Sequence, residues 1–289
     1  MEENINLTDI IFNSLNELFS KLFSSIDNSI YSLLDEIVFI TPDLLKNNSL
    51  NKILGTSGSN GILLICNSLT FGFILYYSIN YLLSHLTYSK IDSPKQFIFK
   101  SIIFIAIMNS SLWICEQIIN LVNILTICLS DISLHLFNTN LGFSEFIDTL
   151  NKSLYLSENF DIFSFDGLVK SFTSFGLITL VFNYSLRYIM IQIFVLISPF
   201  AFLSLIINYS EWFFRIWLKS FLSLLLIQIL ISFILLLSFS INPTANPLFA
   251  KLLYSGIIFA LTKSNSYMKD FFGGISTSIN VNLSSLTGK

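Results

Sequence analysis

Charge is what this 289-residue sequence has least of. Charged residues make up 11% of the chain, hydrophobic residues make up 53%, and the mean hydropathy is +0.73. An ordinary soluble domain carries about a quarter charged residues, which solvate its surface. The scarcity excludes an ordinary soluble fold. The formal net charge of −3 is also too small to indicate a nucleic-acid-binding surface.

Metal-binding and catalytic residues are scarce as well. The sequence has two histidines, His85 and His135, and three cysteines whose spacings fit no zinc or redox motif: Cys66, Cys115 and Cys128. It has no GxxxxGK[ST] loop, and no paired aspartates or Ser–His or His–Glu set at membrane depth. We therefore predict no catalytic residue, no metal and no cofactor, and any transport would need energy from a partner.

Long apolar runs are what the sequence has in abundance. A hydrocarbon core of about 30 Å needs roughly 20 helical residues, and these runs are too uniform for barrel strands. The sequence predicts an all-α integral membrane protein with about five transmembrane helices. The predicted regions are 1–60 (extracytoplasmic amphipathic helix and linker), 61–262 (polytopic membrane domain) and 263–289 (cytoplasmic tail). The predicted spans are 61–86, 101–129, 168–198, 214–240 and 248–261.

The apolar run 168–207 allows two topologies, because Lys170 and Arg187 are its only charged residues. In the first, it crosses once, breaks near Pro199 and lays 199–212 in the interface. In the second, it turns at Arg187 and crosses twice. The positive-inside rule favours the single crossing with the N-terminus outside and the C-terminus inside, because eight bases then face the cytoplasm, against five in the inverted arrangement. The last span, 248–261, is short enough to be re-entrant.

Two segments outside the spans have patterns of their own. Residues 5–40 carry an apolar stripe at helical spacing, which predicts an amphipathic helix on the membrane, on a partner or hairpinned onto the protein's own spans. Pro42 ends this pattern, and 45–61 is predicted to be a linker. The segment 130–166 has six acids against Lys152. We expect it to lie outside and to fold locally.

A few polar residues lie within the predicted spans. Glu116 and Asn120, four apart on one helical face, and Gln117 beside them either line a pathway or bond to neighbouring helices. Arg187 would snorkel to the interface, pair with Glu116 or meet lipid phosphate, and snorkelling is the favoured prediction. These four residues are the candidate pathway or interhelical polar set.

The segment 208–219, NYSEWFFRIWLK, combines aromatic and basic residues directly after the Pro199 region. Its aromatic residues predict a belt at the membrane interface: Tyr209, Trp212, Phe213, Phe214 and Trp217. Arg215 and Lys219, four apart, share a face from which they would reach phosphates. We predict a hinge and interface built from Pro199, Trp212, Arg215, Trp217 and Lys219.

The order of these features resembles a known family. Ser198, Pro199 and Phe200, a short apolar stretch, then Trp212, Phe213, Arg215, Trp217 and Leu218 before a long Leu-rich span are similar to the TrbL-type inner-membrane channel subunits of type IV secretion systems. The resemblance covers about residues 165–245. The chain departs from the family in its short polar C-terminal part and its Ile, Asn, Ser and Phe-rich usage, which implies a small version from a low-GC Gram-positive bacterium.

The resemblance implies a structural role in the bacterial plasma membrane. The chain would be a channel subunit for conjugative DNA transfer, acting as a homo-oligomer with other secretion-channel subunits, separate ATPases, membrane lipid and the translocated DNA–protein substrate. A permease subunit of an ABC-type exporter is the main alternative, with 89–100 as its coupling helix. A holin-like passive pore is a third interpretation.

Overall fold

A computed structural model describes residues 14, 21, 33–55, 60–87, 93–154, 164–241 and 247–273 of the protein. These residues form helices and short connections without a strand, as expected where a membrane leaves no water to satisfy backbone groups. The elements are η1 Pro42–Lys46, α2 Asn48–Leu54, α3 Ile62–Thr87, α4 Pro94–Asn109, α5 Ser111–Phe137, α6 Phe143–Leu154, α7 Phe165–Leu203, η2 Ser204–Ile206, η3 Asn208–Ser210, α8 Glu211–Phe239 and α9 Pro247–Phe272.

Four of the described helices, α3, α5, α7 and α8, are long and apolar enough to cross a membrane. The prediction of a multi-pass helical membrane protein is confirmed to that extent. The expected fifth span, 248–261, lies within α9, which is not among the four. Its apolar stretch is shorter than the roughly 20 residues that a crossing needs, and Lys251 interrupts it. The same helix continues to Phe272, past the predicted start of the cytoplasmic tail at 263, and that boundary stays a prediction.

The predicted second span, 101–129, is divided between two helices. A break at Ser110 separates α4 from α5, and Asn109 there donates its side-chain amide to the carbonyl of Ile105 (2.9 Å) and to the side chain of Asn67 (3.3 Å). The 16 residues of α4 extend over only about 24 Å. The helix of this region that is long and apolar enough to cross a membrane is therefore α5, which extends through Phe137 into the segment predicted to lie outside.

The run 168–207 belongs to one continuous helix, α7, which passes Arg187 without a turn. The helix also continues through Pro199 and ends at Leu203, so the predicted break at Pro199 is wrong, whereas the interfacial placement of 199–212 stays a prediction. Proline cannot donate to the carbonyl four residues back. The Ser198 hydroxyl donates to that carbonyl, on Val195, instead (2.7 Å). The chain reverses in η2 and η3, and α8 begins directly after them.

The N-terminal part packs against the protein's own helices where the structure describes it. Most of the predicted amphipathic helix 5–40 lies outside the described residues, but 33–38 is helical, with Leu34 and Val38 completely buried. The linker prediction for 45–61 is wrong, because η1 and α2 occupy its first half and bury four leucines: Leu44, Leu45, Leu50 and Leu54. Helices as short as η1 and α2 were not predicted, because they contain too few apolar residues to form a periodic pattern in the sequence.

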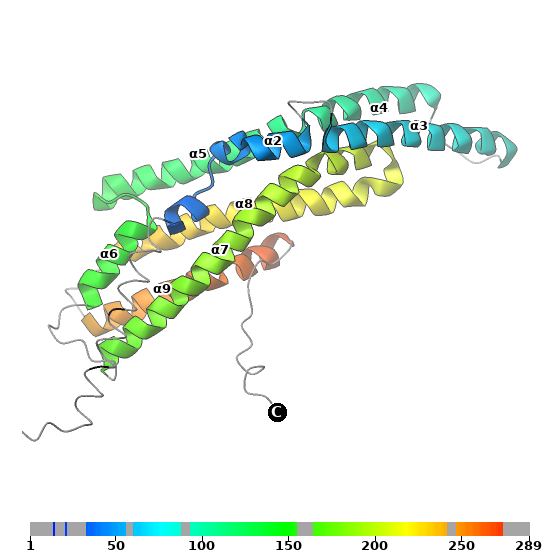
Figure 1. Ribbon diagram of the computed structural model, residues 1–289. Coiled ribbons are helices and arrows are strands. Elements are labelled where there is room, and N and C mark those ends of the chain that lie inside the picture. Colours follow the sequence, from blue (N-terminus) through cyan, green and yellow to red (C-terminus); the bar gives the residue numbers. More distant parts are fainter. Residues whose placement is uncertain are drawn as a thin grey trace, which may run out of the picture.

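The core lies where α7 and α8 pack together and against α5 and α9 (Figure 1). Each of the four helices α3, α5, α7 and α8 has a most apolar window of 18 residues. The buried share of that window is 56% in α7 and in α8, 22% in α5 and 11% in α3. Figure 1 shows α4 and α5 following one another along the long direction of the molecule, with α3 beside α4 at one end. The α3–α4 hairpin therefore exposes most of its apolar surface.

Candidate functional site

Arg187 on α7 is the centre of a buried polar cluster. Its side chain is completely buried, and its Nε donates to the Leu224 carbonyl on α8 (2.7 Å). Nη1 donates to the Val38 carbonyl (3.1 Å), at the end of the helix 33–38. Nη2 has no hydrogen-bond partner within the part of the chain that the structure describes. One guanidinium thus links α7, α8 and the N-terminal part of the fold.

Gln228 makes the second link. It follows Leu224 by one turn of α8 and is completely buried. Its side-chain carbonyl accepts from the Ile40 N–H (3.1 Å), and its amide donates to the Thr126 hydroxyl on α5 (3.2 Å). Thr126 in turn donates to the Val122 carbonyl (3.1 Å). Arg187, Gln228 and Thr126, with the backbone groups that they hold, form what we call the buried polar centre.

Asp35 fixes the other end of the segment 33–40. Its carboxylate accepts from the Phe143 N–H (2.7 Å) and from the backbone N–H (3.4 Å) and hydroxyl (3.0 Å) of Ser144. These N–H groups belong to the first turn of α6, where helix amides lack partners and a negative charge is favourable. The 33–40 segment is therefore tied to α5, α6, α7 and α8.

The chemistry of the centre suits holding a chain segment in place. No acidic side chain of the described residues lies within salt-bridge distance of Arg187. The guanidinium instead meets the carbonyl end of the helix 33–38, which carries partial negative charge. A charge inside a membrane protein is costly, and hydrogen bonds to carbonyls offset only part of that cost. No cluster of three or more His, Cys, Asp or Glu residues in the described ranges could bind a metal.

The four residues of the predicted polar set do not form one site. Arg187 does not snorkel, because it is completely buried, and it is not paired with Glu116. Glu116 is half-buried on α5, where its negative charge acts on Lys46; the pKa of Lys46 is raised chiefly by its hydrogen bond to Asp43. Gln117 is exposed and Asn120 half-buried. A pathway-lining role for Glu116 and Asn120 stays a prediction.

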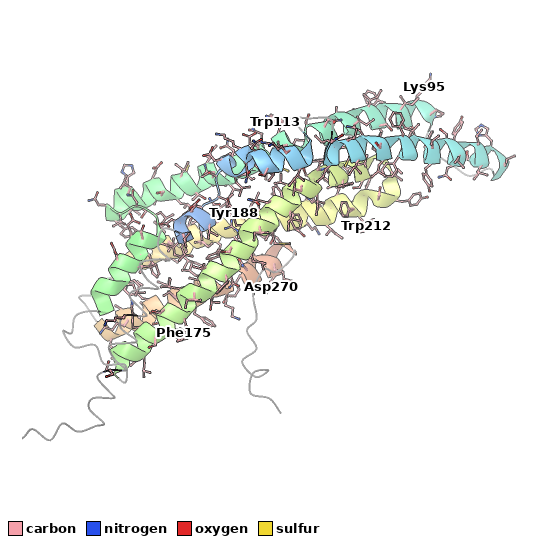
Figure 2. The ribbon with its side chains drawn as sticks, viewed as in Figure 1. Lys95, Trp113, Phe175, Tyr188, Trp212 and Asp270 are labelled. Carbon is pink, nitrogen blue, oxygen red and sulfur yellow. The ribbon has the colours of Figure 1, made fainter. Side chains whose placement is uncertain are left out.

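The predicted hinge is divided between inward-facing and outward-facing aromatic residues. Trp217 is buried, and its Nε1 donates to the Phe194 carbonyl on α7 (2.9 Å). Its ring lies 5.4 Å from Phe202 and 5.3 Å from Phe221, between ring centroids. Trp212 is 61% exposed at the end of the molecule where α8 begins (Figure 2). Only part of the predicted belt can therefore face a membrane interface.

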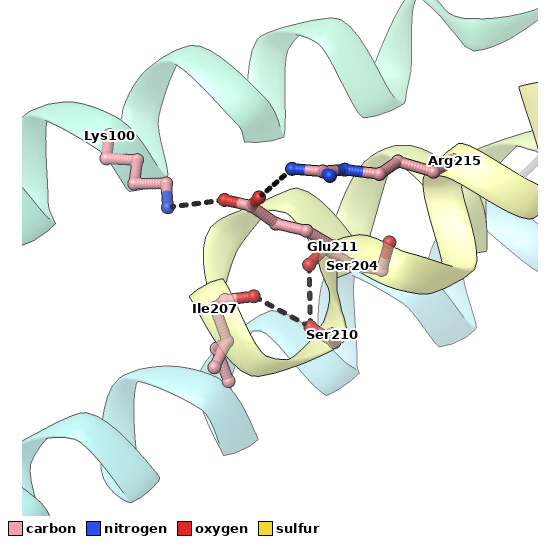
Figure 3. Close-up of polar contacts among 6 residues, drawn as sticks. All are labelled: Lys100, Ser204, Ile207, Ser210, Glu211 and Arg215. Atoms are coloured by element: carbon pink, nitrogen blue, oxygen red, sulfur yellow. Dashed lines mark hydrogen bonds and ion pairs between the residues drawn. The ribbon is translucent and has the colours of Figure 1, made fainter.

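Glu211, the first residue of α8, connects the hinge to α4. Its carboxylate lies 3.8 Å from Lys100 Nζ and 3.4 Å from Arg215 Nη2 (Figure 3). Ser210, just before it, donates its hydroxyl to the carbonyl of Ser204 (2.6 Å) and lies 3.0 Å from that of Ile207. These contacts close the turn between α7 and α8. Lys219 and most of the Arg215 side chain remain exposed, so contact with lipid phosphates stays a prediction for both.

Gln228, Thr126 and Asp35 were not among the site residues predicted from the sequence. Gln228 had a usable signal, because it is the only amide in an otherwise aliphatic, aromatic and serine-containing run at 220–239. A strongly polar side chain at that depth indicates an interhelical contact. Asp35 had no such signal, because an acid on a short amphipathic pattern is usually solvated.

Comparison with known proteins adds no family. No protein-family model matches the chain, and neither a curated protein nor a solved structure matches it.

Proposed function

We propose that this chain is a structural subunit of the inner-membrane channel of a bacterial type IV secretion machine for conjugative DNA transfer. It would act as an oligomer, with separate ATPases supplying energy. The observation that carries the proposal is the pattern of Ser198, Pro199 and Phe200 followed by the Trp212–Leu218 segment. In the structure the two halves of this pattern lie at the end of α7 and the beginning of α8, on either side of the turn between them.

The contacts within that turn give the pattern a physical basis. The Ser198 hydroxyl serves the carbonyl that Pro199 leaves without a donor. The Trp217 indole, from the second half of the pattern, donates to Phe194 just before the first half. Both halves thus contribute to one packed reversal of the chain. This supports treating the pattern as a structural motif, since hydropathy alone would not require a serine and an indole at these places.

The distribution of buried surface supports an oligomer. Few residues in the apolar windows of α3 and α5 are buried, 11% and 22% respectively. The four helices of the described residues that are long and apolar enough to cross a membrane are too few to enclose a wide passage. Several copies, or other channel subunits, would have to enclose it together, with α3 and α5 as the available faces.

Affinity purification from the native membrane tests the proposal. A tagged full-length chain is extracted in mild detergent, and the retained proteins are identified by mass spectrometry. A tagged unrelated polytopic protein from the same cells is the control. We expect specific recovery of a conjugative coupling protein and conjugation ATPases. Specific recovery of an ABC ATPase would replace the proposal with an exporter subunit, and a homo-oligomer alone would favour a passive pore.

A further inference from the structure

A groove lies between α3 and α4, and no residue of the buried polar centre lines it. Its volume is about 500 Å³, within the range of ligand-binding pockets. The residues along it include Tyr77, Tyr81, Phe97, Ser101, Ile102 and Ile105. The rings of Tyr77 and Phe97 stack with their centroids 3.7 Å apart, which joins the two helices. We propose that this groove binds one acyl chain of an anionic phospholipid.

The surroundings of the groove identify hydrocarbon as its environment. Three side chains that line it are more than half exposed: Leu82 (68%), Ile98 (57%) and Ile102 (62%). Neighbouring apolar residues of the hairpin, such as Leu86 and Phe99, are also largely exposed. A continuous apolar surface of this kind is unfavourable in water but not among lipid chains. The groove therefore opens to the membrane.

The size of the groove favours a single lipid chain over a protein helix. An α-helix with its side chains is about 10 Å wide, so 500 Å³ corresponds to roughly one turn of it. A partner helix could insert no more than a few side chains. An extended hydrocarbon chain is much thinner and can follow the whole groove.

Ser101 supplies a polar contact inside the groove. Several helical serines of the described fold donate to a carbonyl one turn back, as Ser68 does to Leu64 and Ser78 to Ile74. Ser101 is 96% buried, lines the groove, and its hydroxyl has no hydrogen-bond partner among the described residues. A buried hydroxyl without an acceptor is unfavourable. The ester carbonyl of a phospholipid would be a suitable acceptor.

The charges at the tip of the hairpin, where α3 leads into α4, favour an anionic headgroup. Neither α3 nor α4 contains an acidic residue. Pro94, which lines the groove, begins α4, and the exposed Lys95 follows it at the tip of the hairpin (Figure 2). Lysine attracts phosphate, and so does the positive end of the helix dipole, although Pro94 has no N–H and the Gln96 N–H already donates to the Ser93 hydroxyl (3.4 Å). Seven residues of helix separate Pro94 from Ser101, about 10 Å. This spacing suits a phosphate at one end and a glycerol ester at the other.

Native mass spectrometry of the delipidated full-length protein tests the assignment. The protein is titrated with phosphatidylglycerol or phosphatidylcholine carrying the same chains. Ile102→Trp fills the groove, and Ile103→Trp, on the next residue outside the lining, is the matched control. We expect Ile102→Trp alone to weaken lipid retention by about tenfold. Equal retention by the two variants, with both folded by size exclusion, overturns the proposal.

Two further comparisons test the polar contacts. Lys95→Gln should reduce the preference for phosphatidylglycerol over phosphatidylcholine by about fivefold, because one lysine near a charged lipid contributes about that much. Equal retention of the two lipids by the unmodified protein refutes an anionic headgroup.

Ester-linked phosphatidylglycerol should be retained about threefold better than its ether-linked analogue, and Ser101→Ala should abolish the difference. No ester preference in the unmodified protein overturns the role of Ser101. These outcomes are independent of the proposed secretion function.

Discussion

Replacing Gln228 by leucine is expected to loosen the 33–40 segment. The change removes the Gln228 acceptor of the Ile40 N–H (3.1 Å), which also donates to the Val38 carbonyl (3.2 Å), and it removes the donor to Thr126 (3.2 Å). Leucine is close to glutamine in volume, so the packing of α8 is largely kept. The effect should therefore come from the two hydrogen bonds.

The expected magnitude follows from those two bonds. A buried hydrogen bond between membrane helices contributes about 0.6–1.5 kcal/mol. Losing two would favour local opening of the segment by about 1–3 kcal/mol, which is roughly a 5- to 150-fold change in the opening equilibrium. The bond from Arg187 to the Val38 carbonyl remains, so we expect more frequent opening without permanent release.

Cysteine labelling in native membranes measures this opening. Val38 is completely buried, so Val38→Cys should react with a maleimide only when the segment opens. The background carries Cys128→Ser, because Cys128 is exposed whereas the other two cysteines are buried. Gln117→Leu makes the same chemical change at an exposed position of α5 and is the matched control.

Two results would refute the reasoning. Equal labelling rates in the Gln228→Leu and Gln117→Leu proteins would show that Gln228 does not hold the segment. A Val38→Cys thiol that reacts as fast as Cys128 in the otherwise unmodified protein would show that the segment does not lie inside the bundle at all.

The remaining predictions concern packing within and around α7. Gly176→Ala should destabilise the protein by about 1–3 kcal/mol, because its new methyl group would overlap the Ile258 side chain; Gly256→Ala, which meets no atom within 4 Å, should leave the unfolding temperature in detergent unlowered. Equal unfolding temperatures for the Gly176→Ala and Gly256→Ala proteins would contradict this prediction. Ser198→Ala should cost about 1 kcal/mol alone but little beside Pro199→Ala, because alanine restores the missing N–H. A double-mutant cycle without coupling would refute that explanation.

Hydropathy was sufficient for the class of protein but not for the ends of its helices. The apolar runs predicted membrane helices, and α3 and α8 follow the predicted spans 61–86 and 214–240 within a few residues. The break at Ser110 was not foreseen, because three polar residues in an apolar run leave the average hydropathy high. The continuation through Pro199 was also missed, because it depends on a neighbouring hydroxyl rather than on proline's own preference.

The sequence by itself determined the helical membrane architecture, because the length of an apolar run is a local property that each segment carries alone. Only the tertiary structure decided what the polar residues inside it do. Arg187 meets Val38 at a separation of 149 residues, and Gln228 meets Ile40 at 188. Periodicity reports which face of a helix is apolar, but the partner of a buried guanidinium or amide depends on how distant helices pack. For that reason an arginine predicted to reach the membrane surface instead holds the backbone of the N-terminal segment.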